Sequence, residues 1–203
     1  MQVKRADSVT SSARRRQIVT AAIQTIAELG YHHASFARIA ERAELSSTRM
    51  ISYHFDGKDE LIGQALSTIY ADLAAFMTAR VGAQTTPVAA LDTYIRSLVE
   101  YIGDHRAEMR AATEIFLNFR PEGGTAAREA ATDLSALAHI ERLLSWGQDT
   151  GAFRPFSTRV MAMAIQRALD GLPFLLEADP DADLAEYAEE LAELFARATW
   201  AAR

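Results

Sequence analysis

The chain has 203 residues, enough for one large domain or for a small domain joined to a larger one, and almost half of the residues are hydrophobic. Charged residues interrupt every stretch, so no apolar run reaches membrane-spanning length, and the lack of cysteine excludes disulfides, thiol catalysis and cysteine-bound zinc. The net charge of −6 is unevenly divided: residues 1–58 hold 9 Lys and Arg against 5 Asp and Glu, a net +4, while residues 59–203 carry −10.

The chain begins with a polar stretch and continues into an amphipathic one. Residues 1–12 are small and polar without helical periodicity, and we interpret them as a flexible basic arm. No apolar signal segment follows Met1, so we expect a soluble, cytoplasmic protein without a membrane partner. From Arg14 to Leu29 apolar residues recur at helical spacing, and Gly30 suits a left-handed C-cap.

Two short helices joined by a turn are predicted between Phe36 and Phe55. Ser35 is a good N-cap for the first, which runs to Ala43 with its apolar residues on one face. Residues 44–47 supply the turn, in which the hydroxyls of Ser46 and Ser47 can cap a second helix over residues 48–55. This is the helix-turn-helix pattern, whose second helix enters the DNA major groove.

The second helix carries the predicted DNA contacts. Met50, Ile51 and Phe55 can pack inward, which leaves Arg49 free for bidentate bonds to guanine O6 and N7. The cation of Lys58, at the start of the following helix, suits a phosphate, as do the arginines of residues 14–16. The residues predicted to bind DNA in and around the two short helices are Ser35, Ser47, Thr48, Arg49, Ser52, Tyr53, His54 and Lys58. The alternative for single residues is ordinary: Ser35 as a cap, Arg49 as a solvated charge.

The first sixty or so residues resemble the DNA-binding domain of the tetracycline-repressor (TetR) family of transcriptional regulators. The resemblance depends on the order and spacing of a set of residues: Arg16, Gln17, Ile18, Ala21, Ala22, Gly30, Tyr31, Ser35, Phe36, Ile39, Ala40, Ala43, Ser46, His54, Phe55, Lys58 and Leu61. Three features depart from the family pattern: Glu44 replaces a usual turn glycine, one extra residue lies near Ser46 to Thr48, and Ser52 replaces a usual tyrosine. A left-handed Glu44 would cost on the order of 1 kcal/mol.

The remaining chain is predicted to be helical throughout. Long helices are expected at 58–80, 87–102, 105–119, 125–148, 157–177 and 183–200, with Pro87 at a helix start and a kink at Pro173. The segment 157–177 is apolar almost all round, so it must be covered on two sides. We therefore predict a four-helix dimer interface that contains Leu169, Leu172, Leu184, Tyr187, Leu191, Leu194, Phe195 and Ala198.

The resemblance also implies a small-molecule pocket in this larger part of the chain. The candidate lining residues are aromatic, methionine or polar: Phe76, Met77, Tyr94, Tyr101, Met109, Glu114, Phe116, Asn118, Phe119, His139, Trp146, Met163, Gln166, Asp170 and Phe174. For each aromatic or Met residue the plain alternative is core packing. If Glu114 and Asp170 are buried beside aromatic residues, a cationic effector is favoured.

These patterns predict an all-α fold with three parts: the arm (1–12), a three-helix DNA-binding domain (13–58), and a larger helical domain for effector binding and dimerisation (59–203). We expect a homodimeric repressor that binds a palindromic operator and is released by an unidentified small-molecule effector, with no catalytic, metal or cofactor site. Two alternatives stay open. One is an architectural or effector-independent DNA-binding protein of the same fold; the other is an all-α enzyme, disfavoured because phosphate loops and paired-histidine helices are lacking.

Overall fold

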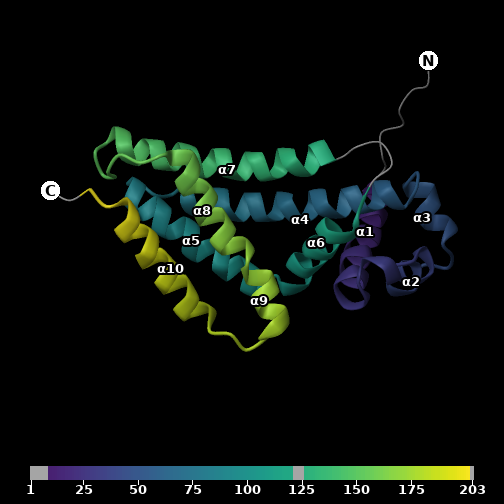
Figure 1. Cartoon of the computed structure of the whole chain (residues 1–203). Helices are drawn as coiled ribbons and strands as arrows, with labels where there is room; N and C mark the ends of the chain where they lie inside the picture. Colours follow the sequence, from purple (N-terminus) through teal and green to yellow (C-terminus); the bar gives the residue numbers. More distant parts are fainter. Residues whose placement is uncertain (1–8, 121–125, 202–203) are drawn as a thin grey trace, which may run out of the picture. The chain divides into compact units, whose positions relative to one another are not determined.

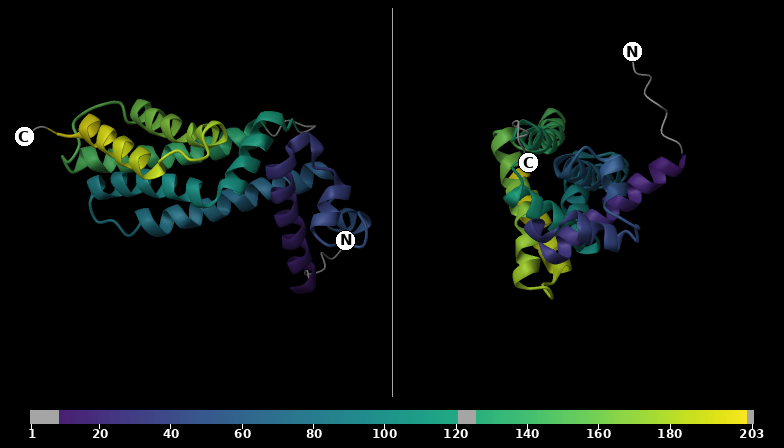
Figure 2. Two further views of the ribbon diagram at one scale, coloured as in Figure 1. Left: turned by 90° about the horizontal axis from the view of Figure 1, so that it is seen from below. Right: turned by 90° about the vertical axis from the view of Figure 1, so that its right-hand side faces the viewer.

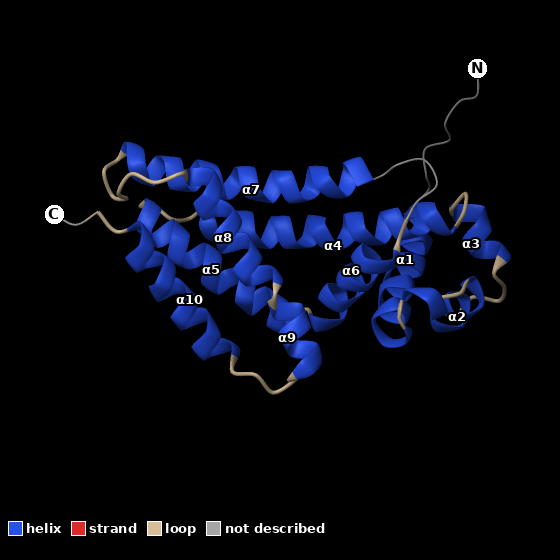
Figure 3. Cartoon of the chain, in the orientation of Figure 1, coloured by secondary structure: helices blue, strands red, loops and turns tan. Residues whose placement is uncertain are grey.

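The computed structural model describes residues 9–120 and 126–201 of the chain. The predicted arm falls largely on residues 1–8, which lie outside the described residues. Within the described ranges the regular elements are all helices joined by short loops, so the predicted all-α class is confirmed (Figure 3). In chain order they are α1 (Val9–Leu29), the 3-10 helix η1 (Tyr31–His33), α2 (Phe36–Arg42), α3 (Arg49–His54), α4 (Lys58–Val81), α5 (Pro87–Asp104), α6 (Arg106–Asn118), α7 (Ala126–Asp149), α8 (Thr158–Asp170), α9 (Leu172–Ala178) and α10 (Leu184–Thr199).

Two predicted boundaries were wrong. Helix α1 begins at Val9, so the last residues assigned to the arm are helical. The single kinked helix expected over 157–177 is instead interrupted at Gly171 and forms α8 and α9. Pro173 accounts for the interruption, because it has no N–H for the carbonyl of Leu169 and its ring is crowded by that carbonyl.

The first compact unit consists of residues up to Ala71 together with 107–121. Its core joins apolar side chains from α1, α2, α3, α6 and the first turns of α4, including Ile18, Ile26, Ile39, Ile51, Phe55, Ile62 and Ile115. Helix α1 packs against α2, η1 and α3, and α2 packs against α3 (Figure 1). The longer helix α1 thus holds the two short helices α2 and α3 in place.

The second compact unit consists of residues 72–106 and 122–203. Helix α5 is its centre: it contacts α7, α8, α9 and α10, and ten of its residues are buried. Helix α10, drawn in yellow in Figure 2, packs against α5. Phe153 and Trp200 form an isolated backbone bridge that joins the loop after α7 to the end of α10.

The packing units do not divide the chain at residue 58. The segments 59–71 and 107–121 pack with the first unit, because their apolar residues complete its core. The division into a DNA-binding part and an effector part stays a prediction about function.

Candidate nucleic-acid interface

The turn between α2 and α3 is built from local backbone interactions. Ser35 caps α2, since its hydroxyl accepts a bond from the N–H of Arg38 at 3.4 Å, as predicted. After α2 the N–H of Leu45 donates to the carbonyl of Ala40 at 2.8 Å, and Glu44 has a φ of 51°. Glu44 therefore adopts the left-handed conformation in which the family usually has glycine.

The first turn of α3 differs from the prediction. Thr48 precedes the helix in a helical conformation, with φ of −63° and ψ of −20°, and no side chain caps the first turn. The N–H groups of Ile51 and Ser52 donate instead to the carbonyl of Thr48, at 3.0 and 3.2 Å. The hydroxyls of Ser46 and Ser47 are thus not used as caps, because the backbone before Arg49 already follows the helix.

The inner face of α3 anchors it to the first unit. Ile51 has 0% and Phe55 2% of its surface exposed, and both belong to the core of that unit. Met50, which was expected to pack inward, is 36% exposed. Two large side chains therefore fix the six-residue helix.

The outer face of α3 consists of exposed side chains. Thr48, Arg49, Ser52 and Tyr53 are all exposed, Tyr53 to 79%, and Ser47 is exposed in the preceding turn. The guanidinium of Arg49 makes no hydrogen bond or ion pair with any residue in the described ranges. The structure thus brings the predicted base-contacting residues together on one exposed surface, with donors that are free to bind a partner.

The two predicted contacts at the end of this surface have internal partners as well. The ring of His54 lies edge-on to the ring of Tyr53, with centroids 5.1 Å apart. Lys58 Nζ donates to the carbonyl of Tyr31 at 3.3 Å and lies 4.5 Å from the centre of that ring. Burial lowers the pKa of Lys58, while the charge of Asp59 acts in the opposite direction. Lys58 therefore ties the start of α4 to η1.

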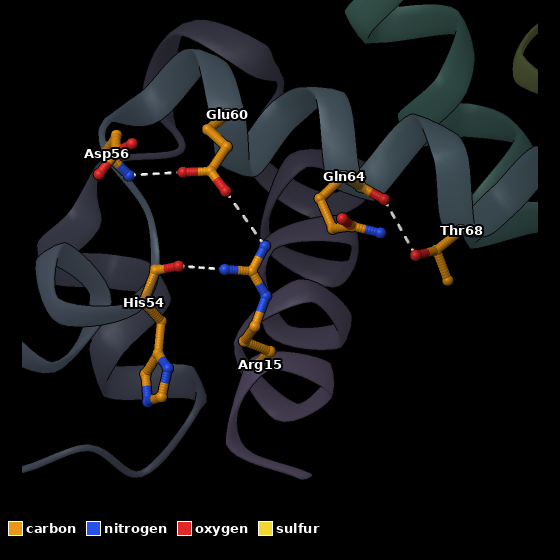
Figure 4. Close-up of polar contacts among 6 residues, drawn as sticks. All are labelled: Arg15, His54, Asp56, Glu60, Gln64 and Thr68. Atoms are coloured by element: carbon orange, nitrogen blue, oxygen red, sulfur yellow. Dashed lines mark hydrogen bonds and ion pairs between the residues drawn. The ribbon is translucent and has the colours of Figure 1, made fainter. Parts of the chain in front are cut away.

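The three arginines of α1 have different surroundings. Arg16 is exposed, and Arg14 Nη1 donates to Gln17 Oε1 at 2.7 Å on the helix surface. Arg15 points toward α3 and α4: its Nη2 donates to Glu60 Oε1 at 3.1 Å and its Nη1 donates to the carbonyl of His54 (Figure 4). Composition and spacing grouped Arg15 with the phosphate contacts, and no sequence signal marked these partners.

Glu60 completes this cluster. Its Oε2 accepts a bond from the N–H of Asp56 at 2.6 Å. That bond, followed by the hydrogen bond and charge of Arg15, lowers the pKa of Glu60 against an opposing effect of burial. The turn between α3 and α4 is thus closed by one carboxylate.

The predicted effector residues do not all belong to one compact unit. Five of them, Met109, Glu114, Phe116, Asn118 and Phe119, lie on or just after α6 in the first unit. There, Glu114 Oε2 accepts a hydrogen bond from the N–H of Tyr31 at 3.0 Å. Asn118 Oδ1 and His32 Nε2 are hydrogen-bonded, 3.2 Å apart. The ring centroids of Phe119 and Tyr31 lie 6.0 Å apart. These three residues hold η1 in place, so the structure gives them a role that the sequence did not suggest.

The other candidates lie in the second unit. Buried Tyr94 donates from its hydroxyl to Gln166 Oε1 at 3.0 Å, and Gln166 Nε2 donates to Asp170 Oδ1 at 2.7 Å. Burial raises the pKa of Tyr94 well above its ordinary value, and the charge of Asp170 adds to the effect. Phe76 packs on Tyr101 with ring centroids 5.1 Å apart, and Met77 is half-buried. The rest are exposed: His139, Trp146, Met163 and Phe174.

The predicted dimer residues differ in their burial. Leu169 and Leu172 are fully buried within the second unit, and Phe195 is 6% exposed, so these three form core rather than a free surface. Tyr187 and Leu194 of α10 are exposed to 36% and 57%. Leu184, Leu191 and Ala198 are intermediate. The dimer prediction included none of the three exposed apolar residues on α8 and α9, which are Val160, Met163 and Phe174.

Comparison with known protein families gives a match over the helix-turn-helix. The family described as "Bacterial regulatory proteins, tetR family" matches residues 18–65. The chain is 29% identical over 174 residues to the HTH-type transcriptional regulator BetI from Cronobacter sakazakii, which covers 81% of this chain and 84% of that protein. It spans between 43% and 54% of the length of several other HTH-type regulators that it matches.

Solved structures share the fold over nearly the whole chain. A bacterial regulatory protein in the tetR family from Rhodococcus RHA1 superposes with a TM-score of 0.79 at 22% identity, covering 94% of this chain and 98% of the other. FadR from Bacillus subtilis, in complex with stearoyl-CoA, superposes with a TM-score of 0.75 at 18% identity, covering 89% and 97%. The matched proteins are transcriptional regulators and not enzymes.

Within residues 9–120 and 126–201, no helix combines the length and the apolar content needed to cross a bilayer.

Proposed function

This chain belongs to the TetR family of DNA-binding transcriptional regulators, and we propose that it is a homodimeric repressor that binds a palindromic operator and is released by a small-molecule effector. The family membership agrees with the resemblance stated from the sequence.

The observation that carries the proposal is the exposed face of α3. Arg49, Ser52 and Tyr53 project from a helix whose opposite face is buried through Ile51 and Phe55. A short helix fixed in this way can enter the major groove, where Arg49 can recognise a guanine and Thr48 a base edge or a thymine methyl group. Ser35, Ser47, His54 and Lys58 flank this face and are proposed to contact the phosphate backbone.

Exposed apolar side chains in the second unit support the homodimer. On α10, Tyr187 and Leu194 lie seven residues apart, on one face of the helix, and on α8 Val160 and Met163 are three residues apart and 68% and 40% exposed. Contiguous exposed apolar residues often mark an interface. We propose that a second copy of the chain covers α8, α9 and α10, with Leu184, Leu191 and Ala198 at its margin.

The second unit is the proposed effector domain. The bound stearoyl-CoA of Bacillus subtilis FadR, a neighbour of the same fold, supports a small molecule as the effector class. Tyr94, Gln166 and Asp170 are the proposed polar anchors, because they bring a hydroxyl, an amide and a carboxylate together beside α5. A regulator of this kind acts where the chromosome is, so we also propose a cytoplasmic location.

Sedimentation velocity on the purified protein, alone and with a duplex that carries its operator, tests the proposed assembly. We expect a dimer alone and two protomers on each palindromic duplex. A single protomer per duplex would contradict the homodimer. A panel of small metabolites added to the complex then separates the two roles: release by one compound supports an effector-controlled repressor, and binding unaffected by every compound favours the architectural alternative.

A further inference from the structure

Arg15 of α1 contacts three residues at or after the C-terminal end of α3: His54, Phe55 and Glu60. Nη1 donates to the carbonyl of His54, and Nη2 donates to Glu60 Oε1 at 3.1 Å (Figure 4). Its guanidinium carbon lies 4.3 Å from the centre of the Phe55 ring. The side chain is 29% exposed, so a large part of it is withdrawn from solvent.

The first contact acts on the end of the recognition helix. His54 is the last residue of α3, and its carbonyl is one of the terminal acceptors that a helix cannot satisfy internally. A six-residue helix has few internal hydrogen bonds, so its direction depends on its neighbours. A cation at its C-terminal end also interacts favourably with the negative end of the helix dipole.

The second contact extends the arrangement to α4. Glu60 accepts from Arg15 with one oxygen and from the N–H of Asp56, at 2.6 Å, with the other. One guanidinium and one carboxylate therefore connect α1, the end of α3 and the start of α4. Phe55, packed below the guanidinium and 2% exposed, holds the same end of α3 in the core.

We propose that Arg15 is a positioning residue for sequence reading: with Glu60 it fixes the direction of α3 against α1 and α4, and it does not bind DNA phosphate itself. The inference rests on the proposed role of α3 in DNA recognition. Base contacts need a helix held within a small error of its productive position, whereas phosphate contacts tolerate more movement. Loss of Arg15 should therefore reduce discrimination between sequences more than overall attraction to DNA.

The test compares Arg15→Gln with Arg16→Gln, its exposed neighbour on the same helix. Binding to the operator and to an unrelated duplex is measured over a range of salt concentrations, after circular dichroism has shown equal helix content. For Arg15→Gln we expect the ratio of operator to unrelated affinity to fall about tenfold with an unchanged salt dependence. For Arg16→Gln we expect both affinities to fall alike and the slope of log K against log salt to decrease by about 0.9, the loss of one phosphate contact.

Glu60→Ala provides a second variant, for which an electrostatic role and a positioning role of Glu60 predict different changes in DNA binding. Removal of a negative charge near DNA strengthens binding to every sequence if only electrostatics matters. If Glu60 positions α3 through Arg15, the operator preference falls. Asp59→Ala, an exposed carboxylate beside it, is the charge-matched control and should keep the preference.

The inference is overturned if Arg15→Gln keeps the wild-type preference for the operator while its slope of log K against log salt decreases by about 0.9, the loss of one phosphate contact. It is also overturned if Glu60→Ala keeps the wild-type preference. A different result exposes failure of the proposed function: the wild-type protein itself would then show no preferred sequence. The two failures are thus distinguished by the wild-type measurement.

Discussion

The backbone N–H of Tyr31 donates to the carboxylate of Glu114 at 3.0 Å, across 83 residues of sequence. Glu114 thereby holds η1 against α6 inside the first compact unit, beside Gly30, whose φ of 79° only glycine adopts easily. A Cβ added at Gly30 would lie 3.3 Å from the same carboxylate oxygen. The joint between α1 and η1 is therefore shaped by Glu114.

Glu114→Ala should lower the free energy of unfolding. The partly buried N–H of Tyr31 loses its acceptor, which costs roughly 1–2 kcal/mol. Urea denaturation followed by circular dichroism measures the change. Glu41→Ala, at an exposed carboxylate in the same unit, is the control and should change stability by no more than about 0.5 kcal/mol. Equal effects of the two substitutions would remove the assigned role of Glu114.

Glu44→Gly should raise stability. The left-handed conformation of Glu44 costs about 1–2 kcal/mol, which glycine would remove. Glycine also makes the unfolded chain more flexible, which offsets roughly half of this gain, so we expect a net increase in stability of about 0.5–1 kcal/mol. A shift of the thermal midpoint to higher temperature is the measurement. The same change at Glu41, within α2, should lower the midpoint, since glycine weakens a helix. A destabilised Glu44→Gly protein would show that the turn is not strained.

Gly147→Ala should be strongly destabilising. A Cβ at this position would lie 1.9 Å from the Phe153 ring, and the N–H of Phe153 is bonded to the carbonyl of Gly147 at 2.9 Å, so the ring has little freedom to move away. We expect a loss of about 3 kcal/mol, typical of severe overpacking. Gly63→Ala is the matched control, because nothing lies within 4 Å of its added Cβ inside α4. That change should stabilise by roughly 0.5–1 kcal/mol in the same denaturation experiment.

Glu60 should contribute to the dependence of stability on pH. Its pKa is lowered in the folded protein by the N–H of Asp56 and by Arg15. A lowered folded pKa means that the contribution is present above the unfolded pKa of about 4.3 and is lost as the pH falls through the folded value. Urea denaturation at a series of acidic pH values should therefore show a shallower loss of stability for Glu60→Gln than for the wild type. An identical acid dependence in the two proteins would contradict this assignment.

Arg49→Ala should relax preference at one base pair. Its guanidinium has no partner in the described part of the chain, so its removal should leave the fold intact. We expect a cost of about 1–3 kcal/mol on the operator, confined to one position of the sequence. Competition with single-position operator variants measures it. Equal weakening at every position would show that Arg49 contacts phosphate.

Local pattern was enough to predict the elements of the DNA-binding part. The burial of Ile51 and Phe55 follows from their spacing, and the roles of Ser35 as a cap and of Gly30 at a positive φ follow from residue type. These features depend on neighbours a few residues away, which a sequence displays directly.

Contacts between distant segments could not be predicted in the same way. Arg15 contacts His54 and Glu60 at separations of 39 and 45 residues, and its place in a run of three arginines suggested a phosphate-binding charge. Leu169 and Leu172 were expected at a dimer interface because their segment is apolar all round, but α5 and the neighbouring helices already cover that surface within one protomer. Periodicity shows that a face is covered, and only the fold shows by what.

Selection of bound sequences from a random duplex pool by the purified protein, at moderate salt, tests the central claim most directly. The account predicts a recovered palindrome with half-site centres about 34 Å apart, or a multiple of that spacing, since two copies of α3 must enter successive major grooves. Recovery of no motif, together with binding to all sequences that disappears as salt rises, would contradict sequence reading by α3.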